Sequence, residues 1–138
     1  MKLILAFTLF TLGSAPFSAS QKQSANNSAS PILGDWHGPS LCLVKPSACH
    51  DEEALYHVKS APDQPGKLSL QAERIADGKP VVMGPDADCN YDTKKKFLRC
   101  DFARGYVELT LKGDRLEGAM FLTDKTRWRE LKLKRVKA

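Results

Sequence analysis

The sequence predicts an all-β fold, a single small antiparallel up-and-down barrel of eight or nine strands. After residue 30, short segments with alternating apolar and polar residues follow one another, separated by turn residues and without a sustained helical repeat. Pairing these segments across their turns brings inward residues opposite inward residues in every pair. Such a meander removes its exposed edges by closing into a barrel, and a two-sheet β-sandwich is the alternative.

The first thirty residues are expected to lie outside the domain. Residues 1–20 have the pattern of a signal peptide, because Lys2 precedes a short apolar run and small residues lead to a cleavage site near Ser20. Residues 21–30 are polar and are expected to form a flexible tail, since they cannot bury enough apolar surface to become ordered. Residues 31–138 are then expected to form one β domain, secreted or periplasmic, without a transmembrane segment.

Turn residues divide the first half of the domain into four expected strands. A turn at 45–48 and a loop rich in Pro and Gly separate the first three. Asp77-Gly78 is a strong hairpin motif, and it pairs Ile75 with Pro80. The expected strands are 32–44, 54–60, 67–75 and 81–83.

The second half of the domain is a series of hairpins. If Cys89 faces Cys100, then Tyr91 lies opposite Leu98 and residues 93–96 form a polar turn. Two more turns then define the last three strands, which are expected at 106–112, 115–123 and 128–134. The expected pairs in this part are Leu111 with Leu116, Leu109 with Gly118, Val107 with Met120, Leu116 with Leu133, Gly118 with Leu131 and Met120 with Arg129.

The four cysteines predict two disulfides. An even number of cysteines in an exported domain usually forms bonded pairs. Cys42 and Cys49 flank a short turn, while Cys89 and Cys100 face each other across a hairpin. The expected bonds are therefore Cys42–Cys49 and Cys89–Cys100.

A Gly-x-Trp motif at the start of the first strand has a candidate partner near the end of the chain. Gly34 allows a close approach of the backbone, and Trp36 carries a large apolar surface. Arg129 shares an inward face with Leu131 and Leu133. We therefore expect its guanidinium group to stack on the Trp36 indole and close the floor of the barrel.

These residues resemble the calycins, the superfamily of lipocalins, avidins and fatty-acid-binding proteins. In lipocalins a Gly-x-Trp on the first strand packs against an arginine near the end of the barrel, and Gly34, Trp36 and Arg129 are the matching positions. The resemblance spans residues 32–136, although the domain is shorter than a typical lipocalin and has no C-terminal helix. It implies a compact secreted lipocalin-like barrel in which these three residues are structural.

The sequence contains no catalytic constellation. We find no nucleophile elbow, no phosphate loop and no paired-cysteine redox motif, so we expect a protein that is not an enzyme and needs no cofactor. His50, Asp51, Glu52 and His57, with the distant His37, are metal-ligating residue types, but their spacing matches no common zinc or copper motif. We therefore expect no metal site.

Two functions fit this architecture. In the first, the barrel binds a small apolar or amphipathic ligand inside its open end, lined by Tyr91, Leu98, Phe102 and Val107, with Arg127 binding an anionic group. In the alternative, a solid barrel acts through its surface as a protein-binding, inhibitory or envelope-associated factor.

The net charge of the chain limits the classes of possible partner only in part. The net charge of +5 favours acidic partners in general. The basic residues are scattered along strands and turns and are not gathered with aromatic residues. We therefore expect no nucleic-acid binding, and we expect a monomer.

Overall fold

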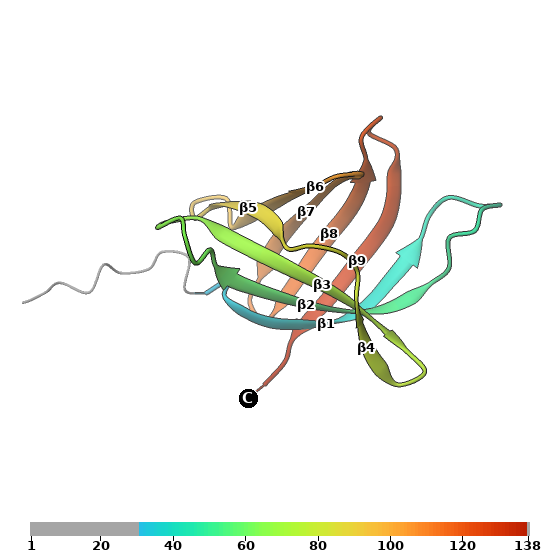
Figure 1. Ribbon diagram of the computed structural model, residues 1–138, viewed down its shortest axis with the longest axis horizontal. Helices are drawn as coiled ribbons and strands as arrows, with labels where there is room; N and C mark the ends of the chain where they lie inside the picture. Colours follow the sequence, from blue (N-terminus) through green and yellow to red (C-terminus); the bar gives the residue numbers. More distant parts are fainter. Residues whose placement is uncertain (1–30, 138) are drawn as a thin grey trace, which may run out of the picture.

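The computed structural model describes residues 31–137, which form a closed antiparallel barrel made only of strands (Figure 1). The predicted all-β up-and-down barrel is therefore confirmed, and the sandwich alternative is wrong. The expected signal peptide and polar tail lie outside the described residues. Within residues 31–137 there is no helix long and apolar enough to cross a membrane.

Nine strands follow one another along the chain, close to the predicted positions. They are β1 (Gly34–Cys42), β2 (Glu52–Ser60), β3 (Leu68–Ala76), β4 (Lys79–Val82), β5 (Ala87–Asp92), β6 (Phe97–Phe102), β7 (Gly105–Lys112), β8 (Arg115–Leu122) and β9 (Arg127–Arg135).

Eight of these strands close the barrel, and β4 is a branch from it. The sheet order is β2-β1-β9-β8-β7-β6-β5-β3-β4, and an additional β2–β3 pairing joins its two sides. β3 divides its free edge between two partners: residues 68–70 pair with β5, and residues 73–76 pair with β4. As a result the β3–β4 hairpin projects from the barrel wall (Figure 1).

The predicted strand registers are confirmed in every hairpin for which we expected one. Cys89 pairs with Cys100, and Tyr91 pairs with Leu98. Ile75 lies opposite Pro80 across the Asp77-Gly78 turn. In the last three strands the observed pairs include Leu111 with Leu116, Leu109 with Gly118, Val107 with Met120, Leu116 with Leu133, Gly118 with Leu131 and Met120 with Arg129.

The inward side chains fill the barrel. The fully buried ones include Trp36, Leu70, Leu98, Leu109 and Leu131, and they belong to a single apolar cluster. Eight strands enclose a space narrow enough for side chains to fill it, and burying each large apolar side chain stabilises the fold by roughly 1.5–3 kcal/mol. This packing, rather than local strand propensity, holds the short strands together.

Both predicted disulfides are present. Cys42 is bonded to Cys49, and Cys89 is bonded to Cys100, so no described cysteine is free. The Cys89–Cys100 bond lies in the apolar cluster and joins directly opposed residues of β5 and β6. Two disulfides in one small domain indicate folding in an oxidising environment.

Candidate functional site at the mouth of the barrel

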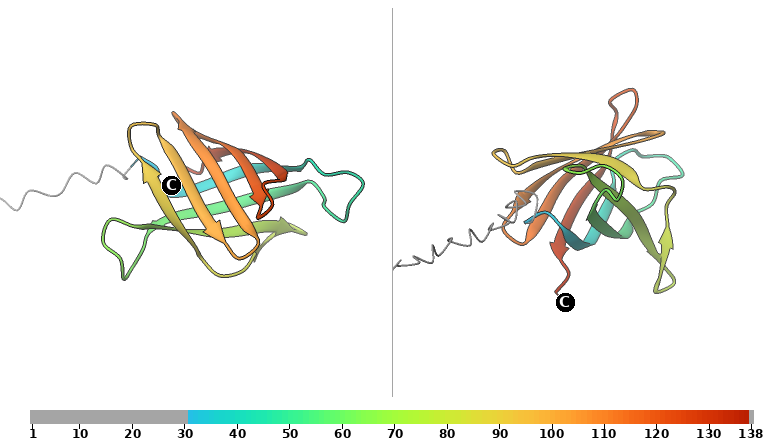
Figure 2. Two further views of the ribbon diagram at one scale, coloured as in Figure 1. Left: turned by 90° about the horizontal axis from the view of Figure 1, so that it is seen from above. Right: turned by 60° about the vertical axis from the view of Figure 1, so that its left-hand side comes forward.

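The barrel has two different ends, because antiparallel strands bring alternate turns to the same side. At the end that we call the closed end lie Trp36, the β5–β6 turn and the β7–β8 turn. At the other end, which we call the mouth, lie residues 43–51, the β3–β4 hairpin and the β8–β9 turn (Figure 1). Figure 2 shows the strands crossing the barrel wall at a tilt, so residues of equal height are several positions apart on neighbouring strands.

At the closed end, Arg135 covers Trp36, so the expected stacking of Arg129 on the indole is wrong. The guanidinium carbon of Arg135 lies 4.2 Å from the centre of the fully buried Trp36 ring. Arg135 also donates hydrogen bonds to the carbonyls of Leu33 (2.9 Å) and Pro31. The Trp36 indole N–H donates to the Ile32 carbonyl at 3.1 Å, so both polar groups of the plug are satisfied.

The motif needs glycine at its first position. Gly34 has a φ of +125°, which L side chains rarely adopt, and a Cβ atom there would lie 3.2 Å from a guanidinium nitrogen of Arg135. Arg135 pairs with Trp36 across the β1–β9 ladder, whereas Arg129 pairs with Cys42. Six residues of strand separate the two arginines, which is roughly 20 Å along β9. The predicted last strand, residues 128–134, ends one residue before Arg135, whereas β9 includes it.

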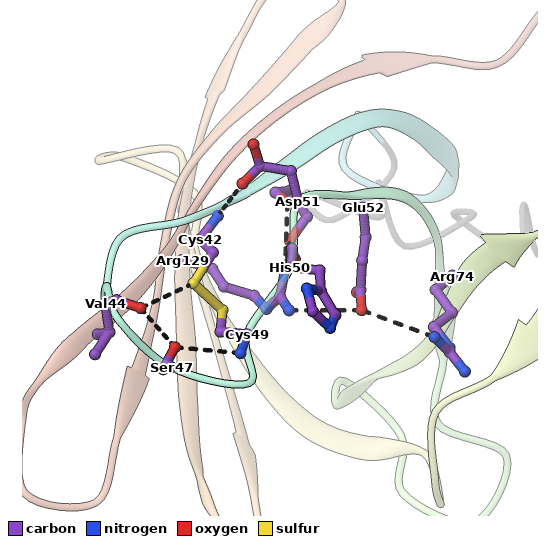
Figure 3. Close-up of polar contacts among 10 residues, drawn as sticks. Cys42, Val44, Ser47, Cys49, His50, Asp51, Glu52, Arg74 and Arg129 are labelled. Carbon is purple, nitrogen blue, oxygen red and sulfur yellow. Dashed lines mark hydrogen bonds and ion pairs between the residues drawn. A yellow bond between two sulfur atoms is a disulfide. The ribbon is translucent and has the colours of Figure 1, made fainter.

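Arg129 is buried at the mouth instead. Its Nη1 donates to the His50 carbonyl at 2.8 Å and to the Ser40 carbonyl at 3.3 Å. Its Nη2 lies 3.5 Å from a carboxylate oxygen of Glu52, and the same oxygen lies 4.0 Å from Nη1 of Arg74 (Figure 3). A buried arginine is stable only when it is paired and hydrogen-bonded, and Arg129 meets both conditions.

The Cys42–Cys49 disulfide helps to place the His50 carbonyl against Arg129. The Cys42–Cys49 bond closes residues 43–48 into a loop, and the Asp51 carboxylate accepts a hydrogen bond of 2.8 Å from the Cys42 backbone N–H (Figure 3). These contacts fix the chain on both sides of His50, whose carbonyl is the shortest contact of Arg129. The buried Arg129 side chain therefore holds the segment that follows the loop against the barrel.

An open groove of about 420 Å³ lies beside this ion pair. Its lining residues come from the ends of β1 and β3, the start of β2 with the two residues before it, and the β3–β4 turn. They are Pro39, Leu41, His50, Asp51, Glu52, Glu53, Arg74, Ile75, Ala76 and Asp77. Four carboxylates and one arginine line the groove, so its surface is negatively charged. A volume of this size is in the range that small ligands or single partner side chains occupy.

Exposed apolar side chains border the groove on the projecting hairpin. Val82 and Met83 are 52% and 49% exposed, and Val81, opposite Arg74, is 40% exposed. Leu43 in the disulfide loop is also exposed. Several exposed apolar side chains at one end of the barrel, near charged residues, are typical of protein interaction sites.

The residues that we expected to bind a ligand do not gather at one place. Leu98 and Val107 are fully buried in the apolar cluster. Tyr91 packs against the cluster toward the closed end, while Phe102 packs against it at the mouth end of β6. Their role as ligand contacts stays a prediction.

Arg127 is exposed, contrary to the inward position that we had expected from strand alternation. Met120 pairs with Arg129 but Phe121 pairs with Arg127, so one extra residue, Trp128, is inserted in β9. Such a β-bulge reverses the alternation for the residues before it. It turns Arg127 to the outside, and no feature of the sequence alone marks its position.

The histidines serve cross-strand ion pairs. His57 Nδ1 lies 2.7 Å from Asp35, and His57 Nε2 lies 3.0 Å from Glu73, so one imidazole bridges three strands. Burial alone would lower the pKa of His57, but the hydrogen bonds to Glu73 and Asp35 outweigh it and hold that pKa above its usual value. His37 pairs with Glu53 at 3.2 Å. Among residues 31–137 no group of His, Cys, Asp and Glu side chains has a geometry that could hold a metal ion.

The sequence matches no protein-family model and no curated protein.

Proposed function

We propose that this protein is a non-enzymatic, exported barrel of calycin-like architecture that binds a partner protein through its mouth. The partner would present a basic side chain beside an apolar one. The observation that carries this proposal is the negatively charged groove of about 420 Å³, bordered by the exposed apolar hairpin of β3 and β4.

The filled interior favours a surface function over an internal ligand. Of the residues that line the groove, none belongs to the buried apolar cluster. Between Trp36 at one end and Arg129 at the other, the inward positions of the strands hold packed side chains. An internal apolar ligand would have to displace this packing, which costs several kcal/mol. Binding inside the barrel therefore remains the second hypothesis.

The charges of the mouth favour a cationic contact. Glu52 is already shared between Arg129 and Arg74, and Glu53 pairs with His37. Asp77 is exposed at the tip of the projecting hairpin and makes no ion pair with another described residue. A lysine or arginine placed in the groove would gain these carboxylates, while Val82 and Met83 would supply the apolar contact.

A peptide titration tests the proposal. We would add a peptide of alternating lysine and leucine to isotope-labelled protein and follow the backbone amide shifts by NMR. We expect shifts at residues 50–53 and 77–83, and Glu53→Gln with Asp77→Asn should weaken binding about tenfold. Met83→Ser should weaken it similarly, because exposed apolar anchors dominate such contacts.

Matched variants at the closed end control for general charge and hydrophobicity. Asp63→Asn with Asp114→Asn removes the same charge, and Val136→Ser removes a similarly exposed apolar side chain. Equal weakening by the mouth and closed-end variants would contradict a site at the mouth. A small apolar molecule retained by the purified protein in native mass spectrometry would favour the internal-ligand hypothesis instead.

A further inference from the structure

A row of basic side chains crosses the outside of the barrel near the closed end. Lys112, Arg115 and Lys134 are direct neighbours across β7, β8 and β9. Lys96, in the β5–β6 turn, extends this row, because its carbonyl accepts a hydrogen bond of 2.8 Å from the Leu111 N–H. Lys132 stands beside it on β9. We call these five residues the basic row, and all of them are exposed.

The basic row differs in its pairing from two other charged parts of the outer surface. There, opposite charges are matched across strands: His57 with Asp35 and Glu73, and Arg99 with Glu108. In the row, Arg115 stands directly opposite both Lys112 and Lys134, and such like-charge contacts oppose folding. Among the described residues, Arg115 and Lys134 have no carboxylate within ion-pair distance.

The carboxylate of Glu117 lies within the row and already experiences its electrostatic field. Glu117 accepts a hydrogen bond of 3.0 Å from Lys112. That hydrogen bond and the charges of Lys112, Arg115 and Lys132 hold the pKa of Glu117 below its ordinary value. The cations therefore act together on an anion placed among them. Glu117 and Glu130, which lies 3.5 Å from Lys132, are too few to neutralise the five cations of the row.

A second hollow gives the row a concave contact surface. It measures about 240 Å³ and is lined by Pro39, Arg115, Glu117, Lys132, Leu133 and Lys134. Three of these six residues are cations of the row. The hollow is large enough for one sulfate, phosphate or carboxylate group. Because neighbouring strands lie about 5 Å apart, a cation on the adjacent strand can contact a second anionic group of the same ligand.

We propose that the basic row binds an anionic polysaccharide. The remaining surface distinguishes this partner from other polyanions. Four of the five exposed large apolar side chains lie at the mouth, which leaves Val136 alone near the row, too few for the apolar anchors that hold a protein on a membrane. The stacked aromatic pair Tyr106–Phe121 lies at the mouth end of β7 and β8, away from the row, so bases would find no stacking partner beside it.

Heparin, a sulfated polysaccharide, is the probe for this proposal. We expect it to bind the full domain, and we expect Lys112→Glu with Lys134→Glu to weaken binding at least tenfold in calorimetry at low salt. The slope of log affinity against log salt should fall by about two, one for each lost contact. The matched control is Lys45→Glu with Lys79→Glu, which makes the same charge change at exposed lysines of the mouth and should weaken binding less than twofold.

A stability measurement separates a binding role from a structural one. Lys134→Glu should raise the melting temperature of the free protein, because it replaces a like-charge contact with Arg115 by an opposite-charge contact. The same substitution should weaken heparin binding. Equal losses in the row and control variants would overturn the proposal, as would tighter row-dependent binding to anionic vesicles or to a single-stranded oligonucleotide.

Discussion

Each end of this barrel has an arginine, half-buried at the closed end and fully buried at the mouth, and the two ends satisfy its polar groups in different ways. At the closed end, Arg135 stacks on Trp36 and donates to two backbone carbonyls, without a carboxylate within ion-pair distance among the described residues. At the mouth, Arg129 donates to backbone carbonyls and pairs with Glu52. The first arrangement seals an apolar core, whereas the second keeps ionised groups beside an open groove. The comparison indicates that the closed end serves stability and that the mouth is suited to binding.

Removing the plug should have the largest effect on stability. Trp36→Ala should lower the free energy of unfolding by about 3–5 kcal/mol, because it leaves a cavity in the core and removes the surface on which Arg135 stacks. Urea denaturation measures this change. Trp128→Ala, on the half-buried bulge of β9, is the control and should cost clearly less. Equal losses for the two tryptophans would mean that Trp36 does not close the barrel.

The two arginines should differ when each is replaced by leucine. Arg129→Leu should cost about 3 kcal/mol, since it leaves Glu52 without its closest cation and two buried carbonyls without a donor. Arg135→Leu should cost about 1–2 kcal/mol, because it loses mainly the stacking on the indole. Lys132→Ala, on the outer face of the same strand, should stay within about 0.5 kcal/mol. If Arg135→Leu were the more costly change, the contrast between the two ends would be reversed.

Removal of the core disulfide should cost slightly less than the loss of Arg129. Replacing Cys89 and Cys100 with alanine should lower the free energy of unfolding by about 2–3 kcal/mol, because the unfolded chain regains the freedom of the closed hairpin. Replacing Cys42 and Cys49 should cost less, since that bond closes a shorter loop and Cys49 is not fully buried. The main effect of replacing Cys42 and Cys49 should be weaker binding of the lysine-leucine peptide at the mouth. Thermal unfolding of both variants, with peptide titration of the second, measures the two effects.

The smallest predicted effect is a pH dependence of stability that comes from the barrel wall. The folded-state pKa of His57 lies above its unfolded value of 6.5, so the folded state binds more protons between the two values. The contribution of His57 is therefore fully present below about pH 6.5 and is lost as the pH rises through the folded pKa. We expect stability to fall by less than about 1 kcal/mol from pH 6 to pH 8.5, because the bridge is partly exposed.

A matched substitution identifies the source of that pH dependence. His57→Gln cannot be protonated and should flatten the curve of urea midpoint against pH over this interval. His37→Gln, at a more exposed pair with Glu53, should leave most of the slope in place. An unchanged slope in His57→Gln would show that another group is responsible.

Much of the fold could be predicted because its contacts are local in the sequence. Each hairpin for which a register was predicted has a short turn, and the period of two then assigns its residues to the two faces of the sheet. Asp77-Gly78 and the pair Cys89–Cys100 fixed their registers in this way, and the structure confirms both. The pairing between β1 and β9 could not be predicted, because these strands are almost a whole domain apart and no turn sets their register.

In the candidate site, too, the local features could be predicted and the contacts between distant strands could not. Glu52, His50 and Asp51 stood out as a polar cluster, but their relation to Arg129 depends on how β1 and β9 align. Arg127 was misplaced because a bulge leaves no mark in the pattern of apolar and polar residues. The exposed edge of β4 arises because β3 changes partners along its length, which is a property of the closed sheet and not of the hairpin.

The sequence by itself determined the strand alternation, the hairpin registers, both disulfides and the Gly-x-Trp plug residue, because each depends on neighbours within about a dozen positions or on the chemistry of one side chain. The tertiary structure alone decided which arginine covers Trp36, which one faces Glu52, and where the charges gather. Those relations depend on the stagger of eight strands around a closed barrel, which accumulates from strand to strand. A stagger of a few residues is invisible in any single segment, yet here it separates a sealed end from a charged mouth.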